Sequence, residues 1–233
     1  MKEYIWGKNS INEALKNRRV IEAYVLSDSE YIKELKQKHI PFQIKKRFEL
    51  DKMSNNQNHQ GIIGVIDSYD LASVDDMVKS ENGLIVLLDG LEDPHNLGAI
   101  MRSVDCTGAD GIIYAKHRSV HLNSTVAKVA CGTMEYVKVA EVTNLVKTLQ
   151  DLKKKGYWVV GTDASAKDMY NEIDYNRNVV LVIGSEGKGI SRLVLKECDY
   201  IVKLPMFGHV NSLNASVATA VMLYKIVETR QSE

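Results

Sequence analysis

The segment 179–191, VVLVIGSEGKGIS, most constrains what this chain can fold into. Five apolar residues, most of them β-branched, lead directly into a turn that contains three glycines. This pattern predicts a buried parallel strand followed by a glycine-rich loop, which is where open α/β sheets place ligands. Glycine there lets a ligand approach the backbone closely. A glycine-rich turn that serves only packing is an equally good interpretation of the spacing alone.

The residues of this turn exclude the common nucleotide-binding motifs. Lys188 precedes Gly189 and is followed by Ile190, so the GxxxxGK[ST] pattern of a P-loop is absent. Arg192 stands where a GxGxxG fingerprint needs its third glycine. Glu186 would repel a phosphate held in the turn. The loop therefore suits a neutral or cationic ligand that is bound mainly by backbone groups.

Charge and composition bound the classes of function. The 30 basic and 30 acidic residues give a net charge of zero, which argues against a strongly basic nucleic-acid coat. The basic clusters at 16–19 and 45–47 could contact phosphates, although solvated helix ends and loops are the simpler interpretation. We expect no membrane span, because no apolar run approaches the roughly 20 residues required. The three scattered cysteines and the absence of a secretory signal favour a cytoplasmic protein without disulfides or zinc.

Hydrophobic periodicity predicts two α/β units. In the first unit we expect helices at 10–17, 30–38 and 49–54, and strands at 20–27, 42–45 and 61–67. The acidic segment 68–82 is expected to be a flexible linker, with a helix near 74–79. In the second unit we expect strands at 84–89, 111–114, 136–142, 157–161, 179–183 and 200–205, and helices at 97–107, 124–131, 143–155, 189–197 and 212–228. Strands that alternate with helices imply a parallel sheet covered on both faces.

Polar residues gather in three segments that follow apolar strands. In 89–102, DGLEDPHNLGAIMR, the side chains of Asn96 and Arg102 could face a site, or could be a helix cap and a solvated residue. Glu186 in the glycine turn could face a ligand or favour the next helix through its dipole. In 202–216, VKLPMFGHVNSLNAS, Ser212 and Asn214 are both good cap residues. The density of small polar side chains there exceeds what one cap needs and suits hydrogen bonds to a ligand.

The histidines and serines do not indicate other chemistry. The histidines at 59, 95, 117, 121 and 209 lack metal-ligand spacing, so we expect them to lie on the surface or to be hydrogen-bonded, with no metal required. Ser185 and Ser212 have no GxSxG context, so hydrolase chemistry is not supported.

Together the three segments resemble one family. DPHNLGAIMRS, VIGSEGKGIS and LPMFGHVNSLNASVA are similar, in order, to the motifs of the SpoU/TrmH branch of the SPOUT methyltransferases. GKNSINEAL and HQGIIGVI resemble the L30e-like RNA-binding domain of bacterial RlmB-like 23S rRNA (guanosine-2′-O-)-methyltransferases. The resemblance implies an L30e-like α/β domain at 1–67, a linker at 68–82, and a parallel-sheet methyltransferase domain at 83–233 with a trefoil knot. Hydrophobic periodicity alone cannot predict a knot.

The same resemblance implies an activity. The enzyme would use S-adenosylmethionine, without a metal, to methylate a ribose 2′-hydroxyl of a guanosine in 23S rRNA. It would be a homodimer, with the final helix in the interface and the active site completed across it. Two alternatives stay open: a tRNA ribose 2′-O-methyltransferase, and a non-catalytic RNA-binding protein on the same scaffold.

The motif matches also assign residues. The resemblance places the following residues in the cofactor site: Thr162, Ile183, Gly184, Gly187, Leu204, Met206 and Leu213. It assigns catalytic roles to Asn96, Arg102, Glu186, Ser212 and Asn214. In this family Arg102 is the proposed base, but a guanidinium is a hydrogen-bond donor only. Gripping the phosphate beside the target ribose is the more cautious role for Arg102.

Overall fold

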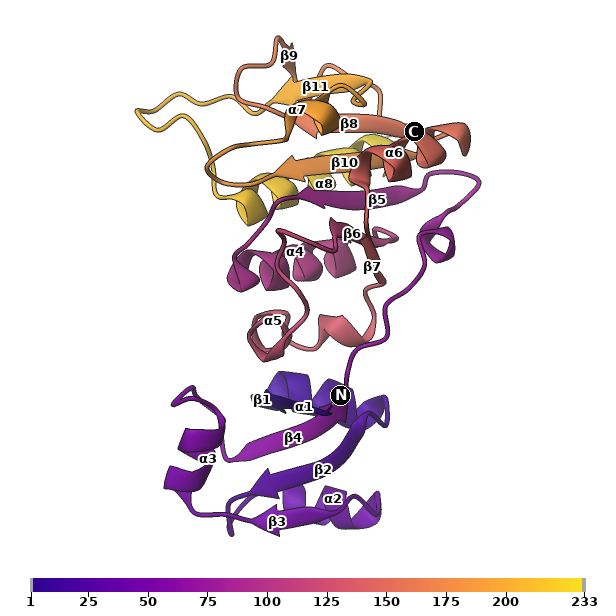
Figure 1. Ribbon diagram of the computed structural model, residues 1–233. Coiled ribbons are helices and arrows are strands. Elements are labelled where there is room, and N and C mark those ends of the chain that lie inside the picture. Colours follow the sequence, from indigo (N-terminus) through magenta and orange to yellow (C-terminus); the bar gives the residue numbers. More distant parts are fainter. Residues whose placement is uncertain (1, 232–233) are drawn as a thin grey trace. The chain divides into compact units, whose positions relative to one another are not determined.

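The structure is a computed structural model that describes residues 2–231, and its chain folds into two compact units (Figure 1). The first unit holds the residues up to Asp70 together with Leu122–Tyr136, and the second holds Leu71–His121 and the residues from Val137 onward. The chain therefore passes between the units three times, at 70–71, 121–122 and 136–137.

The first unit is built on a mixed four-stranded sheet. Its strand order is β1-β4-β2-β3, with antiparallel pairs β1/β4 and β2/β4 and a parallel pair β2/β3. The strands are β1 (Lys2–Trp6), β2 (Val20–Val25), β3 (Phe42–Ile44) and β4 (Ile62–Asp67). The helices are α1 (Lys8–Lys16), α2 (Tyr31–Gln37), α3 (Arg47–Met53) and α5 (Ser124–Val129), with a 3-10 turn η2 (Thr133–Glu135). The hydrophobic pattern predicted each of these elements except β1 and η2.

The segment 122–136 packs on the first unit, although the sequence predicted it within the domain 83–233. The Ser10 hydroxyl donates to the Ala127 carbonyl over 2.9 Å, and the Tyr136 hydroxyl donates to the Glu13 carboxylate. The guanidinium of Arg19 lies 3.7 Å from the Glu135 carboxylate. These contacts explain why a segment that follows the strands of the second unit belongs to the first unit.

The second unit contains a seven-stranded sheet in which every pair of neighbouring strands is parallel. The strand order is β7-β6-β5-β10-β8-β11-β9. The strands are β5 (Leu84–Asp89), β6 (Gly111–Ala115), β7 (Val139–Val142), β8 (Trp158–Thr162), β9 (Asp168–Met169), β10 (Val179–Gly184) and β11 (Tyr200–Lys203). The central strands β5 and β10 are buried along almost their whole length, which their continuous apolar runs predict.

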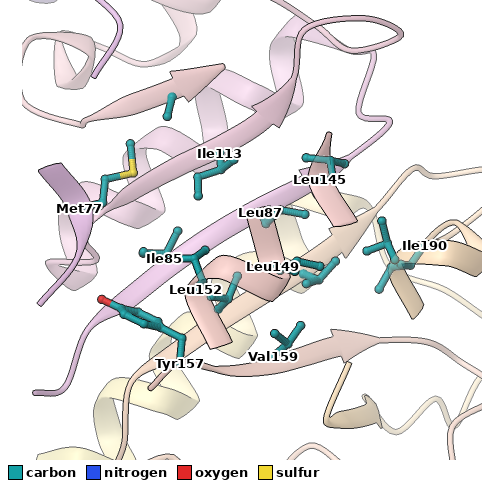
Figure 2. Packing of buried hydrophobic residues seen from close by; sticks show 14 residues of the cluster. Met77, Ile85, Leu87, Ile113, Leu145, Leu149, Leu152, Tyr157, Val159 and Ile190 are labelled. Atoms are coloured by element: carbon teal, nitrogen blue, oxygen red, sulfur yellow. The ribbon is translucent and has the colours of Figure 1, made fainter. Parts of the chain in front are cut away.

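Helices cover both faces of this sheet (Figure 1). They are α4 (Pro94–Thr107), α6 (Leu145–Lys154), α7 (Arg192–Leu195) and α8 (Ala215–Gln231), with a 3-10 turn η1 (Asp75–Met77). Helices α4 and α8 pack against each other, and α8 contacts β10. On the other face, Figure 2 shows Leu145, Leu149 and Leu152 of α6 packed over Ile85 and Leu87 of β5. The parallel, doubly covered sheet that the sequence predicted is confirmed.

The segment 68–82, which we expected to be a flexible linker with a helix near 74–79, packs on the second unit over most of its length and contains only the short 3-10 turn η1. From Leu71 onward this segment belongs to the second unit, and Met77 is buried in the core of that unit (Figure 2). Ala72, Val74 and Val78 pack against the same core. The apolar residues scattered through an acidic stretch thus fix the segment to the sheet.

Two other elements differ from expectation. Helix α7 covers only Arg192–Leu195, because residues before it close a tight loop. The short edge strand β9 carries no pattern that a sequence could reveal. Within residues 2–231 no helix is both long and apolar enough to cross a membrane. The trefoil knot stays a prediction.

Candidate active site

The glycine loop (residues 185–189) forms at the carboxyl end of β10. Ser185 N–H donates to the Gly189 carbonyl over 3.1 Å, and Gly189 N–H donates back to Ser185 over 2.9 Å. This pair closes a tight loop with Glu186 at its tip. A Cβ built on Gly184 would lie 2.1 Å from the Gly189 carbonyl carbon, so the strand and the loop approach too closely for any side chain. The sequence pattern of strand followed by glycine loop is confirmed.

Helix α4 presents Asn96 to this loop. The cap of α4 is Asp93, whose carboxylate accepts from His95 N–H over 2.8 Å, with Pro94 at the first helical position. Asn96 is therefore free of the capping role that its sequence position allowed. Its side chain is only 4% exposed, and its amide donates to the Glu186 carboxylate.

Asn214, just before α8, completes this cluster. Its Oδ1 accepts from the backbone N–H groups of Ser216 over 2.9 Å and Val217 over 3.4 Å, which caps the helix. Its Nδ2 donates to Asn96 Oδ1 over 2.9 Å and to Glu186 Oε1 over 3.0 Å. The structure confirms the interpretation of Asn214 as a helix cap, and its catalytic role stays a prediction.

Asn96, Glu186 and Asn214 thus form one hydrogen-bonded group, which we call the amide–carboxylate cluster. Each member comes from a different one of the three polar segments, and no two are closer than 28 residues in sequence. The carboxylate accepts from both amides, and one amide bridges to the other. Such a network fixes the relative positions of α4, the glycine loop and the start of α8.

A cavity of about 390 Å³ lies beside this cluster, a size that suits a small-molecule ligand. Every residue that the sequence assigned to a cofactor site lines it: Thr162, Ile183, Gly184, Gly187, Leu204, Met206 and Leu213. Glu186 and Ser212 line it as well. The walls combine the ends of β8, β10 and β11 with the apolar side chains of four of these residues. We call it the first cavity.

Other lining residues were missed by sequence reasoning. They are Asp163, Ala164, Val202, Lys203, Asn211, Ala215 and Ala218, with the remaining residues of the glycine loop. Asp163 follows β8 directly and Lys203 ends β11. A rule that examines the last residue of each parallel strand and the one after it would have found both.

Arg102 is the assigned residue that the structure leaves apart. It lies on α4, is exposed, and makes no hydrogen bond or ion pair within the described residues 2–231. It is not part of the amide–carboxylate cluster. Its guanidinium is therefore free to bind a group that comes from outside the chain.

Two histidines have the hydrogen-bonding contacts that we expected of surface or structural histidines. His59 is buried, accepts at Nδ1 from Gly61 N–H over 3.0 Å, and lies with Nε2 3.1 Å from Asp51. Because Nδ1 is an acceptor, Nε2 carries the proton and donates to the carboxylate. His121 lies 3.2 Å from the Glu141 carboxylate and packs edge-on against Tyr114. Both histidines are structural.

Replacing Asn96 with aspartate should destabilise the protein in a pH-dependent way. The variant places two carboxylates within hydrogen-bonding distance, which raises the pKa of the new Asp in the folded state. The stability is retained when that group is protonated and is lost as pH rises through its folded-state pKa. Relative to the native protein we expect a loss of about 1–3 kcal/mol at pH 8 and much less at pH 4, near the pKa of about 3.9 that an aspartate has in the unfolded chain.

The matched control is Asn96→Ala, which removes the amide without adding charge. Its loss of stability should be the same at both pH values in thermal unfolding. Equal destabilisation of the Asp variant at pH 4 and pH 8 would contradict the contact between residue 96 and Glu186.

Known proteins resemble this chain along almost its whole length. YacO of Bacillus subtilis, which carries the name TrmH family tRNA/rRNA methyltransferase, is 45% identical over 240 residues, covering 98% of this chain and 96% of YacO. The SpoU methyltransferase AviRb of Streptomyces viridochromogenes, solved with the cofactor AdoMet, superimposes with a TM-score of 0.88 at 25% identity, covering 99% of this chain and 91% of AviRb. A structure described as an RNA 2′-O ribose methyltransferase superimposes with a TM-score of 0.85 at 26% identity, covering 99% of this chain and 89% of that one.

The fold and these matches define an RNA 2′-O-ribose methyltransferase of the class that uses S-adenosylmethionine. The chain belongs to the SpoU rRNA methylase family, whose pattern matches residues 83–224. Residues 4–72 match the pattern described as RNA 2′-O ribose methyltransferase substrate binding.

Proposed function

We propose that this enzyme transfers the methyl group of S-adenosylmethionine to the ribose 2′-hydroxyl of a guanosine in 23S rRNA. The observation that carries the proposal is the first cavity, which every residue assigned to the cofactor lines and which the amide–carboxylate cluster borders. AviRb, solved with this cofactor, supports the choice of donor.

The chemistry of the first cavity fits the donor. Ile183, Leu204, Met206 and Leu213 offer apolar surface for an adenine ring and a thioether chain. The ends of three parallel strands offer backbone N–H and C=O groups to the polar ends of the molecule. Glu186 supplies a negative charge that favours a sulfonium over a phosphate.

The chain's own residues would position the reaction. When bound, the donor would supply a sulfonium methyl group: the O–C bond to the ribose would form as the S–C bond breaks, S-adenosylhomocysteine would leave, and the proton of the 2′-hydroxyl would pass to solvent water. We assign to Arg102 the phosphate beside the target ribose, because its guanidinium is exposed and unpaired within residues 2–231. That contact fixes the acceptor and lowers the barrier to proton loss electrostatically. Asn96, Glu186 and Asn214 hold the loops that orient donor and acceptor, and Ser212 lines the same cavity.

The first unit would deliver the RNA. We propose that residues 1–67 are an L30e-like RNA-binding domain, to which Leu122–Tyr136 adds, and that residues 83–233 carry the catalytic fold. Such a domain docks structured RNA by shape and backbone contacts while the target nucleotide is unstacked. With its cysteines unpaired and its substrate an RNA, we place the enzyme in the cytoplasm.

The outward face of α8 supports a homodimer. Val217, Val221 and Tyr224 are exposed on this helix, and a hollow of about 590 Å³ adjoins the last two. A helix that is apolar both toward its own core and away from it needs a partner surface. We propose that a second copy of the chain covers this face and completes the active site.

Replacing both Val221 and Tyr224 with glutamate should convert the dimer to a monomer, because burying two charges at an apolar interface is strongly unfavourable. Sedimentation at micromolar concentration measures the mass. The control Lys147→Glu, on the exposed side of α6, should leave the mass unchanged. A dimer of unchanged stability in the double variant would contradict this interface.

The substrate proposal is tested by methyl transfer from labelled S-adenosylmethionine to unmodified 23S rRNA and, in parallel, to unmodified tRNA. We expect label on the 23S rRNA. Label only on tRNA would keep the chemistry and overturn the substrate. Donor binding without label on either RNA would favour the non-catalytic RNA-binding alternative.

A further inference from the structure

A second cavity, of about 900 Å³, adjoins the glycine loop. It shares residues 185–189 with the first cavity and no other lining residue. The rest of its wall comes from the last residues of β5 and β6, the loops that follow them, and Ser191: Asp89, Gly90, Leu91, Glu92, Asp93, Ala115, His117, Arg118 and Ser191. A ligand here would lie directly beside the proposed donor site.

The walls of the second cavity are joined by hydrogen bonds. The Leu91 carbonyl accepts from Val120 N–H over 2.7 Å and from the Ser119 hydroxyl over 3.3 Å. The Asp89 carboxylate accepts from Ser191 N–H over 2.6 Å. The loops after β5, β6 and β10 therefore form one framework, and this framework fixes the backbones that carry Glu92 and Arg118.

Three of the four carboxylates of this wall already have partners within the chain. Asp89 binds Ser191, Asp93 caps α4, and Glu186 belongs to the amide–carboxylate cluster. Within residues 2–231, Glu92 is the lining carboxylate without such a contact, and Arg118 and Lys188 are lining cations without one. One free carboxylate thus faces the same cavity as a free guanidinium.

The backbone of Arg118 has an uncommon conformation for an arginine. Its φ of 59° lies in the left-handed region, in a short bend after β6. Side chains of this size rarely adopt that conformation, and such residues gather at ligand sites. The bend keeps Arg118 at the rim of the second cavity.

We propose that the second cavity takes the base of the nucleotide to be methylated, and that Glu92 and Arg118 select guanine. The inference rests on the proposed function and names the residues that select its guanosine. Glu92 would accept from the N1–H and the exocyclic amine of guanine, and Arg118 would donate to O6 and N7. Lys188 lies on the glycine loop that both cavities share, and it would face a phosphate of the bound RNA.

Guanine is the base that matches both free groups at once. It has two adjacent donors on one edge and two adjacent acceptors on another. Adenine and cytosine pair a donor with a neighbouring acceptor, which a carboxylate repels, and uracil offers a single donor. Because both cavities border the glycine loop, a base in the second cavity places its ribose beside the methyl donor.

The test is nucleoside analysis of RNA methylated in vitro with labelled S-adenosylmethionine. We expect the label in 2′-O-methylguanosine. Label chiefly in another 2′-O-methylnucleoside would overturn the inference and the choice of guanosine, and would leave intact the transfer of a methyl group from S-adenosylmethionine to a ribose 2′-hydroxyl of RNA. Failure of the protein to bind S-adenosylhomocysteine, measured by calorimetry, would instead indicate failure of the proposed function.

Variants test the two residues separately. Glu92→Gln and Arg118→Ala should each lower the rate at least about tenfold without changing the affinity for S-adenosylhomocysteine. Once the target is mapped, a transcript with adenosine at that position should be methylated at least about a hundredfold more slowly than the guanosine transcript. The ratio of the guanosine rate to the adenosine rate should be smaller in Glu92→Gln than in the native enzyme. Native rates and an unchanged ratio in Glu92→Gln would overturn the role of the carboxylate. Asp105→Asn, on the exposed side of α4, is the control.

Discussion

Replacing Arg102 with alanine should lower the rate of methyl transfer at least about a hundredfold, because removal of one preorganised donor to a developing charge has effects of this size. The fold and the affinity for S-adenosylmethionine should not change. Arg102 is exposed, lies outside the first cavity, and has no hydrogen bond or ion pair within residues 2–231 that its loss would break. A large effect on rate alone would therefore identify a contact with RNA.

Two further variants sharpen this prediction. Arg102→Lys keeps the charge and loses the planar fork, so we expect an intermediate rate if bidentate phosphate binding matters. Arg192→Ala removes another exposed arginine of the second unit and should leave the rate unchanged. If Arg102→Ala retained a rate within threefold of the native enzyme, Arg102 would have no role in the reaction.

Replacing Gly184 with alanine should abolish donor binding at ordinary cofactor concentrations. The added Cβ would lie 2.1 Å from the Gly189 carbonyl carbon and 2.3 Å from the Ile190 nitrogen, both of which are backbone atoms that cannot rotate away. The glycine loop must shift, and with it Glu186 and the wall of both cavities. We expect at least about a hundredfold loss of affinity and about 1–3 kcal/mol of destabilisation.

Gly208→Ala is the matched control. A Cβ at Gly208 meets nothing within 4 Å, so affinity and stability should be close to native. Calorimetric titration with S-adenosylmethionine measures the affinity. Donor binding of native strength in Gly184→Ala would show that the first cavity is not the donor site.

The parallel sheet could be predicted from the sequence because each central strand carries its own signal. β5 and β10 are continuous apolar runs, which is the pattern of strands buried on both faces. β1 and β9 could not be predicted. Both lie at sheet edges, where a strand pairs with only one neighbour. An edge strand is less buried than a central one, so its sequence shows a weaker hydrophobic pattern.

The sequence alone could not show which hydrophobic core each segment packs on. The apolar residues of 71–82 and of 122–136 show that these segments pack on something, but periodicity does not say on what. Met77 belongs to the core of the second unit, whereas Ala127 contacts Ser10 of the first. Partner choice depends on tertiary contacts that join positions far apart in the chain.

The same limit applies to the candidate site. Asn96, Glu186 and Asn214 each had a local interpretation, and Asn214 does cap its helix. Asn96 and Glu186 meet because β5 and β10 are neighbours in the sheet, which places their carboxyl ends side by side. Asn214 joins them because α8, which it caps, packs against α4. Local propensity could name the residues but could not show that they touch.

The most direct test of the account is the position of the methyl group on the RNA. Unmodified rRNA should be incubated with the enzyme and labelled S-adenosylmethionine, and then hydrolysed with alkali. A 2′-O-methyl group blocks cleavage of the adjacent phosphodiester, so the account predicts label in alkali-resistant dinucleotides. Label in mononucleotides would mean that a base is methylated, and would contradict ribose 2′-O-methyl transfer.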